Sequence, residues 1–161
     1  MLLLLKIVLL VLCANGAPVL ARRLLPSIVL SRAIDNGMVL SDQQPLLGTS
    51  KTWRGLIASL LLTSLLAWLM GLTLVDGFLI AVFAMTGDLI SSFSKRRLAY
   101  PVSSKVTGLD QIPESLLPWI YATVTYQLPL YYPVAGITVF FILELLLSKI
   151  LYKWGVRKHP Y

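Results

Sequence analysis

Five apolar runs divide the chain, and each is long enough to cross a membrane as a helix. A helix rises about 1.5 Å per residue, so roughly 20 residues cross about 30 Å of hydrocarbon. Tight turns are expected at Asp76-Gly77 and Tyr131-Tyr132-Pro133, and longer polar loops at 22–55 and 95–114. The pattern predicts a single all-α integral membrane domain over 1–161, with about five transmembrane helices near 2–21, 56–75, 77–94, 115–132 and 134–152.

Positive charge is distributed unevenly between the two ends of these runs. All of the 14 Lys and Arg residues except Lys6 lie in the two loops or near the carboxy terminus. Loops rich in Lys and Arg face the cytoplasm. The amino terminus is therefore predicted outside, and both loops and the carboxy terminus in the cytoplasm, in a multi-pass protein of the cytoplasmic (inner) membrane. An interfacial aromatic belt is expected from Trp53, Trp119 and Trp154.

The composition agrees with a membrane protein and argues against several other classes. Of the 161 residues, 57% are hydrophobic and 13% are charged, and the mean hydropathy is +0.80. The net charge is +7, but the basic residues flank apolar runs, so no nucleic-acid partner is expected. Cys13 and His159 are single residues of their types, so neither an internal disulfide nor a zinc site is expected.

The amino-terminal run has two interpretations. Residues 2–12 resemble the apolar core of a signal peptide, and Ala14-Asn15-Gly16-Ala17 resembles a cleavage site. However, no positive charge precedes the run and Lys6 interrupts it. A retained first span, with Lys6 extending to the near surface, is therefore favoured.

The first loop ends in a group of donors beside the start of a helix. Lys51, Thr52 and Arg54 offer ammonium, hydroxyl and guanidinium groups, and such a place suits phosphate. The alternative is that they are ordinary cytoplasmic flanking charges with a threonine cap. The order Gly-Lys-[Ser/Thr] of a Walker A loop is absent, so ATP hydrolysis by a P-loop mechanism is not supported.

Asp88 lies inside an apolar run, where an ionisable group costs roughly 2.5 to 3.5 kcal/mol on insertion scales and is by default a functional site. At helical spacing Asp88, Ser91, Ser92 and Lys95 share one face. Asp110, at the far end of the second loop, could share one Mg²⁺ with Asp88, and Lys95, Arg96 and Arg97 would neutralise further phosphate charge. The alternative is that Asp88 pairs with a neighbouring Lys or Arg in a purely structural role.

Pro18 is expected to kink the first helix because it removes a hydrogen bond and clashes with the carbonyl of Ala14. Asn15 either satisfies the freed backbone group or lines a polar cavity. The sequence leaves both open.

Taken in order, these segments resemble the CDP-archaeol synthase family and, more distantly, the bacterial phosphatidate cytidylyltransferases. The resemblance covers nearly the whole chain and rests on five motifs: Asn15-x-x-Pro18-Val19, Ile34-Asp35-x-Gly37, Lys51-Thr52-Trp53-Arg54-Gly55, Gly87-Asp88-Leu89-x-x-Ser92-Phe93-x-Lys95-Arg96-Arg97 and Leu109-Asp110-Gln111. Two departures stand out. Ile112-Pro113-Glu114 replaces the family's Leu-Asp-Phe, so the second acid is absent or moved to Glu114. The family's Asp-Gly-Arg-Arg run is missing near Asp42.

The resemblance implies a membrane-embedded, Mg²⁺-dependent cytidylyltransferase, with a second cation left open. A lipid phosphate would attack the α-phosphorus of CTP and yield a CDP-lipid and pyrophosphate. By motif position the metal ligands are Asp88 and Asp110. The catalytic residues are Asp88, Asp110, Lys95 and Arg96, and the substrate-binding residues are Asn15, Asp35, Lys51, Thr52, Arg54, Ser92, Arg97, Gln111 and Glu114.

Two other function classes compete with this interpretation. One is a non-catalytic scaffold or subunit that binds anionic lipid through its basic loops. The other is a transferase that consumes a CDP-lipid, which would need several aspartates at helical spacing, and no such cluster occurs. The expected partners are CTP, a lipid phosphate and the bilayer. The sequence does not decide the lipid tails or whether the protein forms a homodimer.

Overall fold

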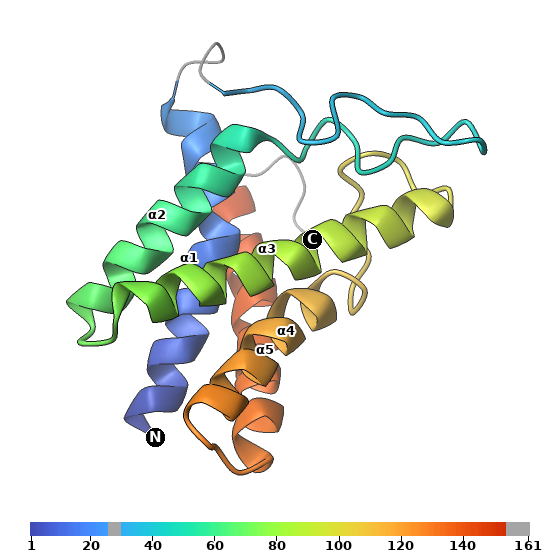
Figure 1. Cartoon of the computed structure of the whole chain (residues 1–161). Coiled ribbons are helices and arrows are strands. Elements are labelled where there is room, and N and C mark those ends of the chain that lie inside the picture. Colours follow the sequence, from blue (N-terminus) through green and yellow to red (C-terminus); the bar gives the residue numbers. More distant parts are fainter. Residues whose placement is uncertain (26–29, 154–161) are drawn as a thin grey trace.

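The computed structural model describes residues 1–25 and 30–153, and these form five helices (Figure 1). Within the described residues, β pairing is limited to two isolated bridges, Ala33 with Thr52 and Val39 with Pro45. The predicted all-α class and the number of helices are confirmed. The helices are α1 (Leu2–Leu24), α2 (Trp53–Leu69), α3 (Leu74–Arg97), α4 (Gln111–Thr125) and α5 (Tyr131–Lys153).

Three of the five helices meet the length and composition of a membrane span: α1, α3 and the Tyr131–Ile150 part of α5. Helix α2 is apolar but has 17 residues, and α4 has 15, which correspond to about 26 Å and 23 Å. Both are shorter than a hydrocarbon layer of about 30 Å. Five full-length spans were predicted, and three helices have the length and composition of one.

The two tight turns lie several residues before the predicted positions. The α2–α3 turn spans 70–73, and Gly71 adopts a left-handed φ of +74° there. Thr73 and Asp76 then form a reciprocal capping box, which begins α3 before Asp76. The α4–α5 connection spans 126–130, and Pro133 lies in the first turn of α5, where proline is tolerated. The predicted turns at Asp76-Gly77 and Tyr131-Tyr132-Pro133 are wrong, because the capping box begins α3 at Leu74 and Tyr131-Tyr132-Pro133 already belongs to the first turn of α5.

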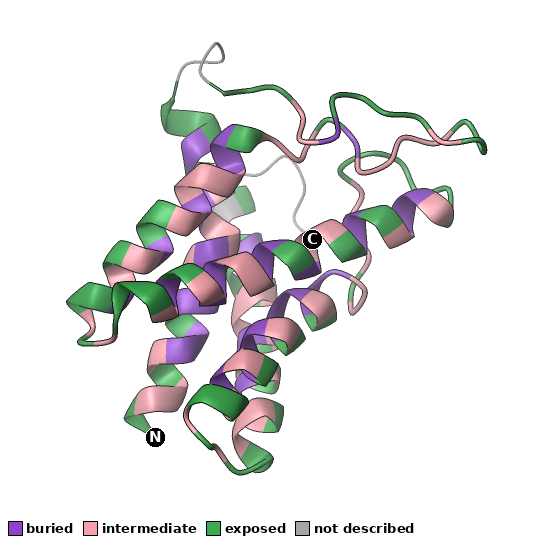
Figure 2. Cartoon of the chain, viewed as in Figure 1, coloured by how far each residue is buried: buried purple, intermediate pink, exposed green. Residues whose placement is uncertain are grey.

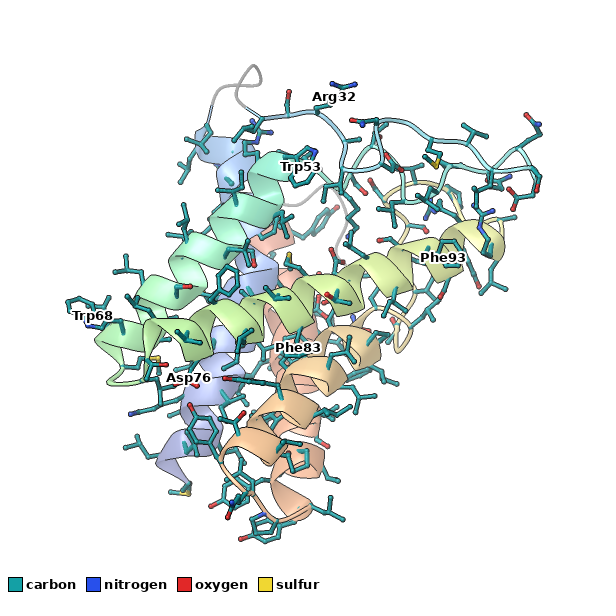
Figure 3. The ribbon with its side chains drawn as sticks, viewed as in Figure 1. Arg32, Trp53, Trp68, Asp76, Phe83 and Phe93 are labelled. Atoms are coloured by element: carbon teal, nitrogen blue, oxygen red, sulfur yellow. The ribbon has the colours of Figure 1, made fainter. Side chains whose placement is uncertain are left out.

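Both long loops emerge at the same end of the bundle (Figure 1). This end, called the loop end here, holds the carboxy-terminal ends of α1 and α3 and the amino-terminal ends of α2 and α4. The two tight turns occupy the opposite, turn end. Trp53 and Trp68 are exposed at the two ends of α2 (Figure 3). The arrangement brings the motifs of α2, α3 and α4 together at the loop end.

The buried residues lie on the faces that the five helices turn toward one another (Figure 2). Ile7, Leu10 and Val11 of α1 form a cluster with Trp119 and Phe140. Trp119 is fully buried and therefore does not belong to the expected interfacial belt, whereas Trp53 is exposed as expected. Trp154 and His159 lie outside the described residues.

Glycine at position 87 permits α3 and α4 to approach closely. A Cβ added there would lie 2.1 Å from the carbonyl oxygen of Pro113 and 2.7 Å from the amide nitrogen of Glu114. No side chain fits at such a distance, so this contact sets the spacing between the two helices. Small residues commonly allow such close approach in membrane bundles.

We predict that Gly87→Ala will destabilise the fold by about 1–3 kcal/mol, because the added methyl group overpacks the α3–α4 contact. The measurement is the free energy of unfolding in detergent, followed by circular dichroism. Gly16→Ala in α1 is the matched control, since a Cβ at residue 16 meets nothing within 4 Å. Equal stability of the two variants would contradict the prediction.

Candidate functional site

An ion pair between Lys51 and Asp88 occupies the centre of the loop end. The Nζ atom of Lys51 lies 2.6 Å from Oδ1 and 2.5 Å from Oδ2 of Asp88, and the two side chains are 19% and 20% exposed. Lys51 comes from the first loop and Asp88 from the middle of α3. The pair therefore joins two segments that the sequence places far apart, and both carry motifs of the sequence analysis.

Backbone pairing fixes the position of Lys51. The amide of Ile34 donates to the carbonyl of Lys51 at 2.9 Å, and Ala33 forms a bridge with Thr52. Thr52 is the N-cap of α2, and its Oγ1 accepts from the amide of Gly55 at 3.3 Å. The threonine cap expected under the alternative interpretation of this motif is thus present. It also orients the loop segment that carries Lys51.

Asp35 organises the first loop. Its Oδ1 accepts the amide of Gly37 at 3.0 Å, and its Oδ2 accepts those of Leu47 and Gly48 at 2.9 and 3.0 Å. Burial acts to raise the pKa of Asp35, but these backbone donors outweigh it and lower the pKa below its usual value. The carboxylate proposed for substrate contact is thus engaged in holding the loop.

A cavity of about 60 Å³ opens beside the ion pair. Its polar side is formed by Arg22, Ser50, Lys51, Thr52 and Asp88. Its apolar side is formed by Pro18, Ile34, Leu56, Met85 and Leu89, and Gly55 completes the lining. Helices α1, α2 and α3 and the first loop all contribute, so charged groups and apolar walls meet in one place.

A second charged cluster lies farther along α3. The Nζ atom of Lys95 is 2.6 Å from Oδ1 of Asp110 and donates to the carbonyl of Ser104 at 2.8 Å. Oδ2 of Asp110 accepts the amide of Val106 at 2.9 Å. The structure thus places Asp88 with Lys51 and Asp110 with Lys95, and it gives each carboxylate a lysine partner.

Arg96 has no hydrogen-bond partner for two of its nitrogens within the described chain. The residue is 2% exposed, and its Nε and Nη1 atoms are buried without an acceptor. It interacts electrostatically with Asp110. A buried donor left unpaired costs about 1–3 kcal/mol. An anion at this position would satisfy it.

Glu114 lies beside Asp88, at the place where Gly87 lets α4 approach. It is 8% exposed and interacts electrostatically with Asp88, Lys51 and Glu144. The acid that departs from the family pattern by one residue is therefore next to the central ion pair. Gln111 is fully buried nearby on α4, and its Oε1 accepts the amide of Gly108 at 2.7 Å.

Other predicted site residues make structural contacts. Nη1 of Arg54 donates to the carbonyl of Leu25 at 3.2 Å. Arg97 pairs with Asp42 at 2.5 Å, donates to the carbonyl of Pro45 at 2.8 Å and stacks on Phe93. Arg97 therefore clamps the first loop. Ser92 is buried on the same helix face as Lys95.

Asn15, one turn before Pro18 in α1, has a local partner. Its Nδ2 donates to the carbonyl of Val11 at 3.2 Å within the same helix. The carbonyl of Ala14, which Pro18 leaves without its helical donor, accepts instead from Oγ of Ser59 at 2.9 Å. Asn15 was expected either to bind this freed carbonyl or to line a polar cavity. The first expectation is wrong, because Ser59 of α2 binds the carbonyl.

The comparisons with known proteins agree with one another. The family model described as CarS-like CDP-archaeol synthase matches residues 1–161. The chain belongs to the CDP-archaeol synthase family. The CDP-archaeol synthase of Pyrobaculum arsenaticum is 30% identical over 153 residues, covering 92% of this chain and 91% of its own. That of Pyrococcus furiosus is 32% identical over 158 residues, covering 92% and 85%.

A solved structure, described as an intramembrane enzyme for archaeal membrane lipids biosynthesis, has the same fold. It is 28% identical to this chain with a TM-score of 0.71, and the match covers 89% of this chain and 90% of the other. This member of the CDP-archaeol synthase family is therefore a multi-span helical membrane protein, as its composition predicted.

Two polar residues of this CDP-archaeol synthase family member escaped the sequence analysis. Glu144 lies in the apolar run of α5, and Nζ of Lys105 is 3.1 Å from its Oε1 and 3.3 Å from Oγ of Ser148. The rule that singled out Asp88, an acid inside an apolar run, applies equally to Glu144. Arg22 lines the cavity but gave no signal, because its charge was attributed to membrane orientation.

We predict that the first loop will loosen as the pH falls below the ordinary carboxyl range. The pKa of Asp35 is lower in the folded chain than in the unfolded one, so its stabilisation is full above the unfolded value, about 3.9, and is lost as the pH falls through the lowered value. Hydrogen exchange at the Leu47 and Gly48 amides, corrected for intrinsic rates, should accelerate there. In Asp35→Asn these amides should exchange rapidly already at neutral pH, and unchanged protection in that variant would contradict the assignment.

Proposed function

We propose that this protein is a CTP-dependent cytidylyltransferase that converts a membrane lipid phosphate into a CDP-activated lipid and pyrophosphate. The family match over the whole chain supports the reaction class. The observation from the structure that carries the proposal is the Lys51–Asp88 ion pair lining a cavity at the loop end of membrane helices. A lipid headgroup and a soluble nucleotide can meet at such a place.

The chemistry needs little beyond positioning and neutralisation of charge. An oxygen of the lipid phosphate attacks the α-phosphorus of CTP, the bond from that phosphorus to the bridging oxygen of the β-phosphate breaks, and pyrophosphate leaves. Because the nucleophile is already anionic, no strong base is required. Lys51, Lys95 and Arg96 supply fixed positive charge in a site largely shielded from water.

A divalent cation fits the donors around Asp88 better than those around Asp110. Mg²⁺ usually takes one or two carboxylates together with water and substrate phosphates. Asp88 and Glu114 adjoin and would hold it together once Lys51 leaves Asp88, whereas Asp110 is engaged by both Lys95 and the Val106 amide. The described residues contain no group of three acidic, His or Cys ligands, which agrees with a site completed by substrate. When bound, Mg²⁺ would neutralise phosphate charge.

The loop end is proposed to face the cytoplasm, where CTP is available, with the amino terminus outside. All Lys and Arg residues except Lys6 belong to the two long loops, the helix ends beside them or the carboxy-terminal part of the chain. This distribution agrees with the positive-inside rule. The cavity of about 60 Å³ is smaller than nucleotide pockets of roughly 300–1,000 Å³. Substrate entry therefore requires the first loop to move away from α3.

The central test is formation of a CDP-lipid by the purified protein. With radiolabelled CTP, Mg²⁺ and a panel of diacyl and diprenyl lipid phosphates, wild type should release a lipid-soluble labelled product. Asp88→Asn should lower kcat/KM by at least about a hundredfold, because it removes a carboxylate that would hold Mg²⁺ at the reacting phosphates. Inactivity of the wild type on every lipid would favour the scaffold alternative, which depends only on basic charge.

The Mg²⁺ dependence of turnover distinguishes the role of Glu114 from that of Asp110. Glu114→Gln should raise the Mg²⁺ concentration needed for half-maximal turnover, since it removes a carboxylate beside Asp88. Asp110→Asn should abolish most turnover while leaving membrane insertion unchanged, because Lys95 loses its partner, and the residual activity should keep the wild-type Mg²⁺ dependence. A Mg²⁺ shift in Asp110→Asn but not in Glu114→Gln would move the metal to Asp110.

A further inference from the structure

Arg22 is the one cavity-lining cation without an acidic partner in the described chain. The charged side chains that line the cavity are Arg22, Lys51 and Asp88. Lys51 and Asp88 neutralise each other, whereas Nη2 of Arg22 donates to the neutral carbonyl of Ser50 at 3.0 Å. The cavity therefore carries a net positive charge that comes from Arg22, and it attracts anions.

We propose that Arg22 binds the phosphate of the lipid substrate; this rests on the proposed function and names a substrate contact within it. A guanidinium has five donors in a fixed fork that matches two phosphate oxygens. One nitrogen of Arg22 is used by Ser50, and the exposed side chain keeps the others available to the cavity.

The depth of Arg22 favours the lipid phosphate over the nucleotide. Arg22 lies in the last turn of α1, a helix long and apolar enough to span the membrane, and Leu20, Leu24 and Leu25 around it are exposed. The residue is therefore at the level where hydrocarbon ends and headgroups begin. Pro18 and Leu89 line the same cavity and suit the first carbons of a lipid.

The second cationic cluster leaves the nucleotide a separate place. Lys95 lies seven residues beyond Asp88 on α3, which corresponds to about 10 Å along the helix. Arg96, with its unpaired donors, follows directly. Arg22 of α1 lines the cavity with Asp88, whereas Lys95 and Arg96 lie about two turns farther along α3, so a lipid phosphate and a triphosphate would occupy separate places near Asp88. In-line attack requires the nucleophile and the leaving group on opposite sides of the α-phosphorus.

The test separates the two substrates kinetically. Arg22→Ala should raise KM for the lipid phosphate about tenfold, the loss of a charge-assisted hydrogen bond, and change KM for CTP less than about twofold. Arg22→Lys, which keeps the charge but not the fork, should lie between wild type and Arg22→Ala. Arg23→Ala is the matched control, because Arg23 occupies the same helix turn and is not part of the cavity lining.

Three results would overturn the proposal. A rise in KM for CTP rather than for lipid would assign Arg22 to the nucleotide. Equal effects in Arg22→Ala and Arg23→Ala would reduce Arg22 to a general surface charge. If Arg22→Ala changed kcat and the KM values for lipid and for CTP by similar factors, Arg22 would act only by holding the first loop through Ser50.

A binding measurement keeps this proposal separate from the proposed reaction. Dihexanoyl phosphatidate, a soluble lipid phosphate, should raise the unfolding temperature of wild type and Arg23→Ala in detergent, but not of Arg22→Ala. CTP is the second probe and should act equally on all three. If wild type makes no CDP-lipid, the reaction fails as proposed, and the phosphatidate shift alone decides whether Arg22 binds phosphate.

Discussion

The ion pair between Lys51 and Asp88 is the constraint on which the loop end depends. A carboxylate in the middle of α3 would be costly among membrane helices unless a cation lies beside it. The only way for Lys51 to reach it is for the first loop to fold back over α3. That path needs the bridge to Ala33, the threonine cap of α2 and the three amides gathered by Asp35. Removing one partner would leave a partly buried charge uncompensated, which is more costly than losing the pair as a whole.

Close helix contacts place the remaining polar groups around this pair. Gly87 lets α4 approach until Glu114 adjoins Asp88, and Gly136 makes room on α5 for the indole of Trp119. Ser59 of α2 satisfies the carbonyl that Pro18 frees in α1. The hydrophobic effect cannot drive helices together in lipid. Here close packing at small residues and a hydrogen bond from a hydroxyl hold the helices together instead. The polar site is therefore built by the same contacts that hold the bundle.

The sequence predicted what depends on local pattern and missed what depends on the path of the loops. The apolar runs indicated five helices, and helical spacing placed Ser91, Ser92 and Lys95 on one face of α3, where all three are buried. The α2–α3 turn was misplaced because Asp-Gly was read as a turn, whereas Asp76 completes a capping box. Asp35 accepts the amides of Leu47 and Gly48, and Arg97 binds the Asp42 carboxylate and the carbonyl of Pro45. No spacing rule reveals these distant partners. Trp119 was misassigned because an interfacial tryptophan and one packed on a glycine look alike in sequence.

The two basic centres differ in what an incoming anion does to them. Lys51 is already neutralised by Asp88, and both side chains retain some exposure, so phosphate must compete with an existing carboxylate. Arg96 is almost fully buried, and two of its nitrogens are unpaired in the described chain, so an anion there relieves a cost that folding has already incurred. Because Arg96 is so deeply buried, an anion reaches it only after a rearrangement, as it does beside Lys51, but at Arg96 the anion would supply hydrogen bonds that the described chain leaves unmade.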